Sequence, residues 1–147
     1  NTAFKEIVAE ARRVSADEVA SAVESTRKEL DRTEKDTRVP AHGAVRDQRA
    51  LQRAIPRLEK AWQSIGDLEP EAKDVSATDR LTSTRAELRQ RLVEAYLAMG
   101  SIYLQRRALP DAEEWCNKAC ELDPENQQLH PLHQLILQAK LVGGWRN

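Results

Sequence analysis

Aromatic residues and glycine are scarce in this chain of 147 residues. It contains three Trp, two Tyr, one Phe and five Gly, whereas β-sandwiches and barrels need many tight turns and strands rich in β-branched or aromatic residues. Ala, Leu, Glu, Arg and Gln dominate instead, and all five favour helices. The composition therefore predicts an all-α protein, either a single domain or a short helical array.

Long apolar runs and an excess of one charge are also missing. No stretch approaches the roughly 20 apolar residues of a membrane-spanning helix, and the N-terminus lacks the basic-then-apolar pattern of a signal peptide. The 23 basic and 24 acidic residues give a net charge of -1, so the overall charge attracts neither nucleic acid nor an anionic membrane. We expect a soluble protein without a membrane or nucleic-acid partner. Because the chain starts at Asn1, we also expect an excised or processed piece.

Cysteine is nearly absent, because the chain contains only two, Cys116 and Cys120. Four residues apart on one helix they suit a disulfide poorly, and free thiols favour a reducing compartment such as the cytoplasm. Together with His130 and His133 they have the ligand types of a zinc site, but the histidine spacing is short for one and Cys116 also fits helix packing. We therefore predict no metal site and no cofactor. Since no activating histidine, phosphate loop or other catalytic motif is evident, we expect no enzyme and no catalytic residue.

Apolar residues at helical spacing begin at Phe4 and continue to Leu30. Within this stretch Ser15 and Glu18 resemble a capping box, so the segment is either one long helix or two helices that meet there. The stripe has charged flanks, as in a coiled coil. Docking on its own domain and dimerisation both remain open as its role.

Pro40 and Gly43 mark the expected linker, because both residues disfavour a continuing helix. The chain is thus divided into an N-terminal helical segment, 1–37, and a helical domain, 38–147, that form one compact unit. Pro56 either kinks the helix that contains it or begins a new one. Further helices are predicted from Pro56 to Leu68, over about thirty residues from Ser76, from Pro110 to Leu122, and from about His130 to Gly143.

Residues 93–126 contain a regular pattern of aromatic, small and turn residues. Gly100 and Ala112 are small, which allows two antiparallel helices to approach closely, and bulkier residues fill the seam on either side. Pro124 then ends the pair. The pattern resembles the tetratricopeptide repeat, which is about 34 residues long, with Cys116 where an aromatic residue or Leu is more usual. The predicted repeat core consists of Tyr96, Met99, Gly100, Tyr103, Ala112, Cys116, Ala119 and Pro124.

The resemblance implies antiparallel helix pairs, as in a fragment of an α-solenoid. A single pair leaves its outer faces uncovered, so further pairs are expected. Residues 55–71 align without a gap on residues 109–125, which predicts a diverged copy around 41–71 with residues 41–54 as its first helix. The last helix matches the repeat poorly and is expected to cap the open end of the stack.

Basic residues recur between positions 46 and 60. We interpret them as an ordinary solvated helix face rather than a phosphate- or acid-binding patch, because acidic residues are interleaved with them. No acidic block is evident near this basic run in the sequence. The run consists of Arg46, Arg49, Arg53, Arg57 and Lys60.

Proteins with tetratricopeptide repeats hold a peptide or helix of another protein on a concave surface, formed largely by the first helix of each pair. The resemblance therefore implies a noncatalytic scaffold or adaptor for protein–protein interaction. One subclass clamps acidic chaperone tails with Lys and Asn at the positions of Leu97 and Ser101, so that specificity is disfavoured here. The alternative function is a structural subunit that forms a homo-oligomer through its N-terminal amphipathic helix. The expected partner-binding residues are Glu94, Leu97, Ser101, Leu104 and Gln105.

Overall fold

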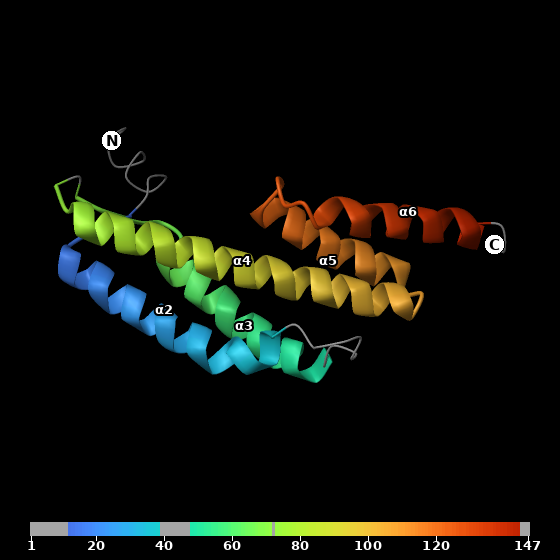
Figure 1. The fold of residues 1–147 in the computed structure, drawn as a ribbon, viewed down its shortest axis with the longest axis horizontal. Helices are drawn as coiled ribbons and strands as arrows, with labels where there is room; N and C mark the ends of the chain where they lie inside the picture. The colour runs from blue at the N-terminus through green and yellow to red at the C-terminus, as the bar shows by residue number, and fades with distance from the viewer. Residues whose placement is uncertain (1–11, 39–47, 72, 145–147) are drawn as a thin grey trace, which may run out of the picture.

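The structure is a computed structural model that describes residues 12–38, 48–71 and 73–144. These residues form five helices and one pair of short strands (Figure 1). The all-helical character predicted from the composition is confirmed, whereas no sequence alternation predicts the two strands. In chain order the elements are β1 (Arg12–Val14), α2 (Ala16–Thr37), α3 (Gln48–Ile65), β2 (Leu68–Pro70), α4 (Val75–Gln105), α5 (Leu109–Leu122) and α6 (Leu129–Gly144).

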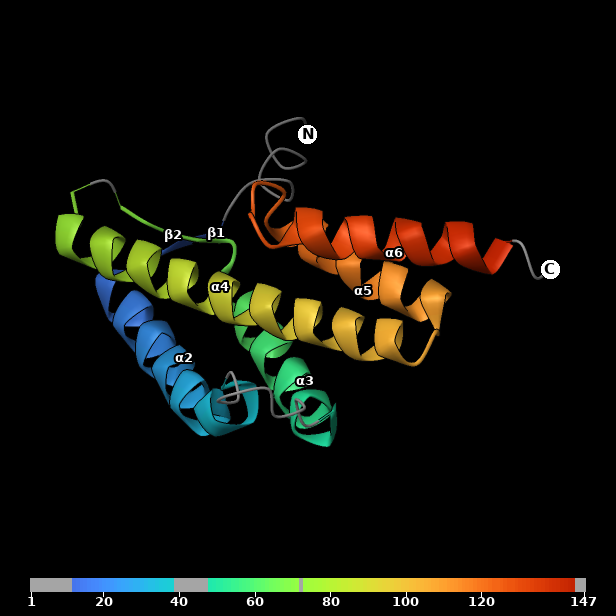
Figure 2. The ribbon, with the colours of Figure 1, turned by 45° about the vertical axis from the view of Figure 1, so that its right-hand side comes forward.

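Helix α4 is the central element of the fold. It has α2 and α3 on one side and α5 and α6 on the other (Figure 1 and Figure 2), and it contacts all four of them. Consecutive helices run in opposite directions along the molecule. The N-terminus of α3 reaches the C-terminal half of α4, where the Gln48 amide donates a hydrogen bond to the Tyr103 hydroxyl (Nε2 to OH, 3.4 Å). One hydrophobic cluster therefore extends through all five helices.

Helix α2 begins where Ser15 and Glu18 predict it. The Ser15 hydroxyl oxygen accepts a hydrogen bond from the Glu18 backbone N–H (3.3 Å), which satisfies one of the free donors at the helix start. Residues Arg12–Val14 form a strand, so the expectation of a helical segment throughout 1–37 is wrong there. Residues 1–11 and 39–47, which include most of the expected linker, lie outside the described residues. The buried stripe of α2 is made of Val19, Val23, Thr26, Leu30, Thr33 and Thr37.

Helix α3 passes through Pro56 without interruption. Pro56 is exposed, so the Gln52 carbonyl that loses its helical donor faces solvent, where water can satisfy it. On the opposite face Ile55 and Leu58 remain buried on either side of the proline. The alternative in which Pro56 begins a new helix is therefore wrong. Because Gln48–Ile65 is a single helix, the expected diverged helix pair around 41–71 is also wrong for its described residues.

The two strands close one end of the bundle. They pair in parallel, with Arg12 opposite Leu68 and Val14 opposite Pro70. Arg85 of α4 fixes the turn before β2, since its guanidinium donates hydrogen bonds to the carbonyl oxygens of Ile65 (2.8 Å) and Leu68. Burial lowers the pKa of Arg85, and nearby carboxylates oppose that shift. This arrangement carries the chain from α3 into α4.

The two halves of α4 are buried differently. In the first half a single stripe is buried, as expected for a helix that covers only one face of a core. From Leu92 to Gly100 every residue except Glu94 is buried, because α3, α5 and α6 together surround this half. The stripe of the first half is made of Ala77, Leu81, Thr84 and Leu88.

Candidate functional site

Gly100 of α4 faces both α5 and α6 at short distance. A Cβ atom at this position would lie 3.1 Å from Leu132 Cδ2 of α6 and 3.5 Å from the Ala112 carbonyl oxygen of α5. The first distance is shorter than an ordinary carbon–carbon contact, so even one added carbon requires the Leu132 side chain to shift, and a larger side chain overpacks the contact. The other residues of the expected repeat core differ in burial: Tyr96, Met99, Ala112, Cys116 and Ala119 are buried, Tyr103 is half-buried, and Pro124 is exposed just after α5.

A hollow of about 360 Å³ lies between α4 and α6. It contains Glu94, Leu97 and Ser101, which are three of the five expected partner-binding residues. The other two do not line it: Leu104 packs against the core half-buried, and Gln105 is exposed at the last residue of α4. The full lining, which we call the α4–α6 groove, is Glu94, Leu97, Ala98, Ser101, Gln128, Pro131, Leu132 and Leu135.

The two walls of the α4–α6 groove have the same residue spacing. Each residue on the second wall follows its counterpart on the first by 34 positions. Positions 34 residues apart, on α4 and on the segment from Gln128 into α6, therefore face one hollow. The pairs are Glu94 and Gln128, Leu97 and Pro131, Ala98 and Leu132, and Ser101 and Leu135.

Helix α6 exposes more large apolar side chains than any other described helix. Leu135 is 52% exposed at the groove, while Leu141 and Val142 are 72% and 59% exposed near the end of the helix. Figure 1 shows that the C-terminal end of α6 extends past the turn that joins α4 to α5. The exposed leucine at the groove is thus distinct from the apolar residues at the overhanging end.

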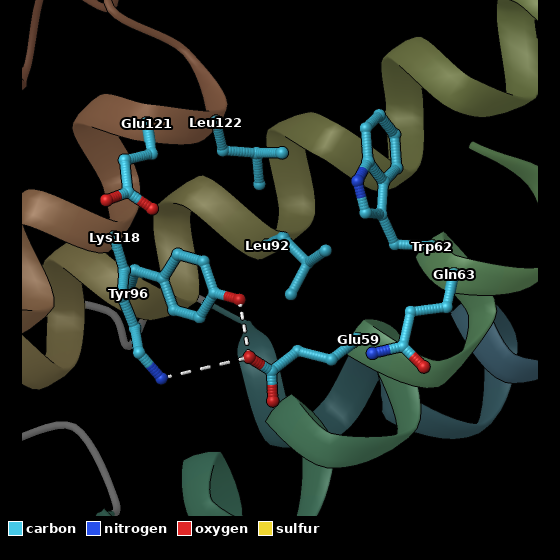
Figure 3. Close-up of a pocket in the computed structure, with 8 residues that line it drawn as sticks. All are labelled: Glu59, Trp62, Gln63, Leu92, Tyr96, Lys118, Glu121 and Leu122. Atoms are coloured by element: carbon cyan, nitrogen blue, oxygen red, sulfur yellow. Dashed lines mark hydrogen bonds and ion pairs between the residues drawn. The ribbon is translucent and has the colours of Figure 1, made fainter. Parts of the chain in front are cut away.

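A second hollow, of about 300 Å³, opens where α3, α4 and α5 meet (Figure 3). Its polar centre is Glu59, whose Oε2 accepts a hydrogen bond from the Tyr96 hydroxyl (2.7 Å) and lies 4.0 Å from Lys118 Nζ. Burial, and then the hydrogen bond to Glu59 and its charge, raise the pKa of Tyr96. We call it the α3–α5 hollow, and its lining is Glu59, Trp62, Gln63, Leu92, Tyr96, Lys118, Glu121 and Leu122.

Cys116, Cys120, His130 and His133 do not assemble a metal site in the described part of the chain. Cys116 is buried, with its Sγ 4.0 Å from His133 Nδ1, whereas Cys120 is exposed, and both are free thiols. Within the described ranges no group of three or more His, Cys, Asp or Glu residues could hold a metal ion. Burial is the main cause of the raised pKa of Cys116, so a smaller fraction of this thiol is ionised at neutral pH.

The basic run of α3 does face acids, contrary to the expectation from the sequence. Arg53 pairs with Asp36 and Arg57 with Glu29, at 3.5 Å in each case. Both acids belong to α2, which the fold places beside α3. Arg46, the first residue of the run, lies outside the described residues. The pairing weakens this surface as a candidate for binding phosphate.

Sequence reasoning missed the second wall of the groove and the whole α3–α5 hollow. The 34-residue spacing, applied to Glu94, Leu97 and Ser101, would have found Gln128, Pro131 and Leu135. No comparable signal exists for the α3–α5 hollow, because its residues come from three helices that meet only in the fold.

Comparison with protein-family models, with curated protein sequences and with solved structures finds no match. None of the five helices in the described part of the chain combines the length and apolar character that crossing a membrane requires.

Proposed function

We propose that this chain is a noncatalytic protein-interaction module that holds a peptide or helix of another protein in the α4–α6 groove. The observation that carries this proposal is the matched lining of the groove, in which equivalent positions of α4 and α6 face one hollow. Three residues that the tetratricopeptide resemblance assigns to partner binding lie in it. The 34-residue spacing of its walls supports the same resemblance.

The lining of the groove indicates the chemistry of the partner. Leu97, Leu132 and the half-exposed Leu135 offer apolar surface, and Ser101 and Gln128 offer hydrogen-bonding groups beside it. Glu94 is the sole charged residue among the lining residues. An amphipathic segment with apolar anchors and a donor or cation beside them complements this surface.

Self-association through the N-terminal helix is the less supported function. The apolar stripe of the described part of that helix is already buried: Val19 is 1% exposed and Leu30 is 2% exposed. A partner could reach this stripe only by displacing α3 or α4. Light scattering tests the point, since a stable homo-oligomer of the unmodified protein would favour self-association, whereas a strict monomer would exclude it.

The groove can be tested with two substitutions of the same kind on α6. Leu135→Glu places a charge in the groove, and Leu141→Glu places one on the overhanging end, where the side chain is 72% exposed. Both positions tolerate the change structurally because each side chain is at least half exposed. A displayed library of amphipathic peptides is selected on the unmodified protein, and the selected peptides are then titrated against both variants.

We expect Leu135→Glu to weaken peptide binding by about tenfold or more, because it buries a charge against apolar anchors. Leu141→Glu should bind like the unmodified protein. Selected peptides that bind both variants equally would contradict the proposal, and circular dichroism confirms that both variants are folded.

A further inference from the structure

The α3–α5 hollow has the features of a cation-binding site and lies apart from the α4–α6 groove. Trp62 and Tyr96 stand on opposite sides of Leu92 (Figure 3), so two aromatic residues flank an apolar base. The carboxylates of Glu59 and Glu121 also line the hollow, against the single ammonium group of Lys118. The lining charges therefore sum to one negative charge, and aromatic faces also attract cations.

The fold already holds one cation against these groups. The Lys118 ammonium lies 4.7 Å from the centroid of the Trp115 ring, 5.8 Å from that of Tyr96, and 4.0 Å from Glu59 Oε2. Yet this ion pair is at the limit of contact distance, and the Lys118 side chain is 43% exposed. Among the described residues both polar contacts of Glu59 use Oε2, which leaves Oε1 for another donor. Glu121 is exposed and has no ion pair within the described residues.

We propose that the α3–α5 hollow binds an arginine side chain of a peptide or protein partner. A guanidinium is flat, so it can stack on the Trp62 face while its N–H groups reach the Glu59 carboxylate and the Gln63 amide oxygen. A lysine ammonium lacks this flat shape and fits the same walls less well. The hollow is about 300 Å³, the lower end of the range for small-molecule sites, and this size suits one long side chain.

The test uses two short peptides that differ in one charge. Acetyl-Gly-Ser-arginine-Ser-Gly-amide is titrated into ¹⁵N-labelled protein, and the same peptide with citrulline, a neutral isostere of arginine, is the control ligand. The indole N–H resonance of Trp62 reports on the hollow. We expect the arginine peptide to shift this resonance and the citrulline peptide to bind at least fivefold more weakly. Equal shifts with both peptides would overturn the proposal.

Two variants then locate the binding. Glu59→Gln keeps an acceptor for the Tyr96 hydroxyl but removes the charge, and we expect about two- to fivefold weaker binding of the arginine peptide, the range of an exposed ion pair. Glu114→Gln, an exposed acid of α5 outside the hollow, is the matched control. If both variants bind the arginine peptide alike, the hollow is not the site.

Two further variants keep the test decisive. Trp62→Leu removes the stacking face without removing charge. Binding of the arginine peptide to this variant is followed through the amide resonances around Tyr96. Unchanged affinity would also contradict the proposal. The inference does not rest on the α4–α6 groove. Leu135→Glu should bind the arginine peptide normally, so failure of one proposal is distinguishable from failure of the other.

Discussion

The two halves of α4 belong to one continuous helix but have different surroundings. The first half buries one stripe against α2 and α3, and its opposite face is open to solvent. The second half is enclosed by α3, α5 and α6, with Met99 and Val93 at 0% exposure. One face of a helix can be covered by two neighbours, whereas enclosure requires a third. A single helix thus serves as an edge at one end and as the core at the other, and the α4–α6 groove and the α3–α5 hollow both lie along the enclosed end.

The largest effect should be common to both halves. Leu88 in the first half and Met99 in the second are each 0% exposed. Leu88→Ala and Met99→Ala should each lower the free energy of unfolding by about 2 to 5 kcal/mol, because each leaves a cavity in the core. Urea denaturation measures this loss. A loss well below 1 kcal/mol in one variant alone would show that its half of α4 is not packed as described.

Enlarging a small residue should affect stability differently in the two halves of α4. Gly100→Leu inserts four carbons where a Cβ atom alone already lies 3.1 Å from Leu132, and we expect a loss of about 1 to 3 kcal/mol or more from overpacking. Ala86→Leu, at an exposed position of the first half, should change stability by about 0.5 kcal/mol or less. Thermal unfolding of the pair tests the contrast. Full stability of Gly100→Leu would refute the close approach of α4, α5 and α6.

The polar contact of the enclosed half gives a smaller, pH-dependent effect. Tyr96→Phe loses the hydrogen bond to Glu59, and we expect a cost of about 1 kcal/mol at neutral pH. Because the folded pKa of Tyr96 is raised, its contribution is fully present below the unfolded pKa of about 10 and is lost as pH rises toward the folded pKa.

The alkaline loss of stability should therefore shrink in Tyr96→Phe relative to the unmodified protein. Urea denaturation between about pH 9 and pH 11 measures it. Tyr103→Phe is the matched control, since Tyr96 remains in that variant. If stability falls equally with pH in the unmodified protein and in Tyr96→Phe, the Tyr96 hydroxyl is neither desolvated nor hydrogen-bonded to Glu59 as described.

The smallest effect is expected where enclosure ends. Leu141 lies three residues before the end of α6, and it is 72% exposed. Leu141→Lys should leave the free energy of unfolding within about 0.5 kcal/mol. Differential scanning calorimetry checks this expectation, and a clear loss would mean that the overhanging end packs against the molecule.

Local signals in the sequence predicted most helix boundaries. Ser15 fixes the start of α2 through its own hydrogen bond. The start of α4 is close to the prediction, but its N-cap is Asp74, and the predicted N-cap Ser76 is the second residue of the helix. Pro110 lies at the second residue of α5. Such signals work because capping groups and proline act on the residues next to them.

The errors concern features that depend on distant residues. Pro56 looked like a boundary, but the packing of Ile55 and Leu58 keeps the helix continuous through it. The strands were missed because three residues cannot show an alternation, and each strand exists through pairing with the other. Of the expected partner-binding residues, Leu104 and Gln105 lie past the hollow, where α4 approaches its end.

The β1–β2 ladder has a consequence for the order of folding. Arg12 and Leu68 are adjacent in the ladder although more than fifty residues of chain separate them. Closing a loop of this length costs about 3 to 4 kcal/mol in chain entropy, whereas α4 and α5 are joined by a short turn and dock at little such cost. Contacts between distant residues form slowly for this reason. The ladder should therefore assemble after the helices and be among the first parts of the native state to open, so the backbone amides of Arg13 and Glu69 should exchange with solvent faster than those of Val93 and Met99.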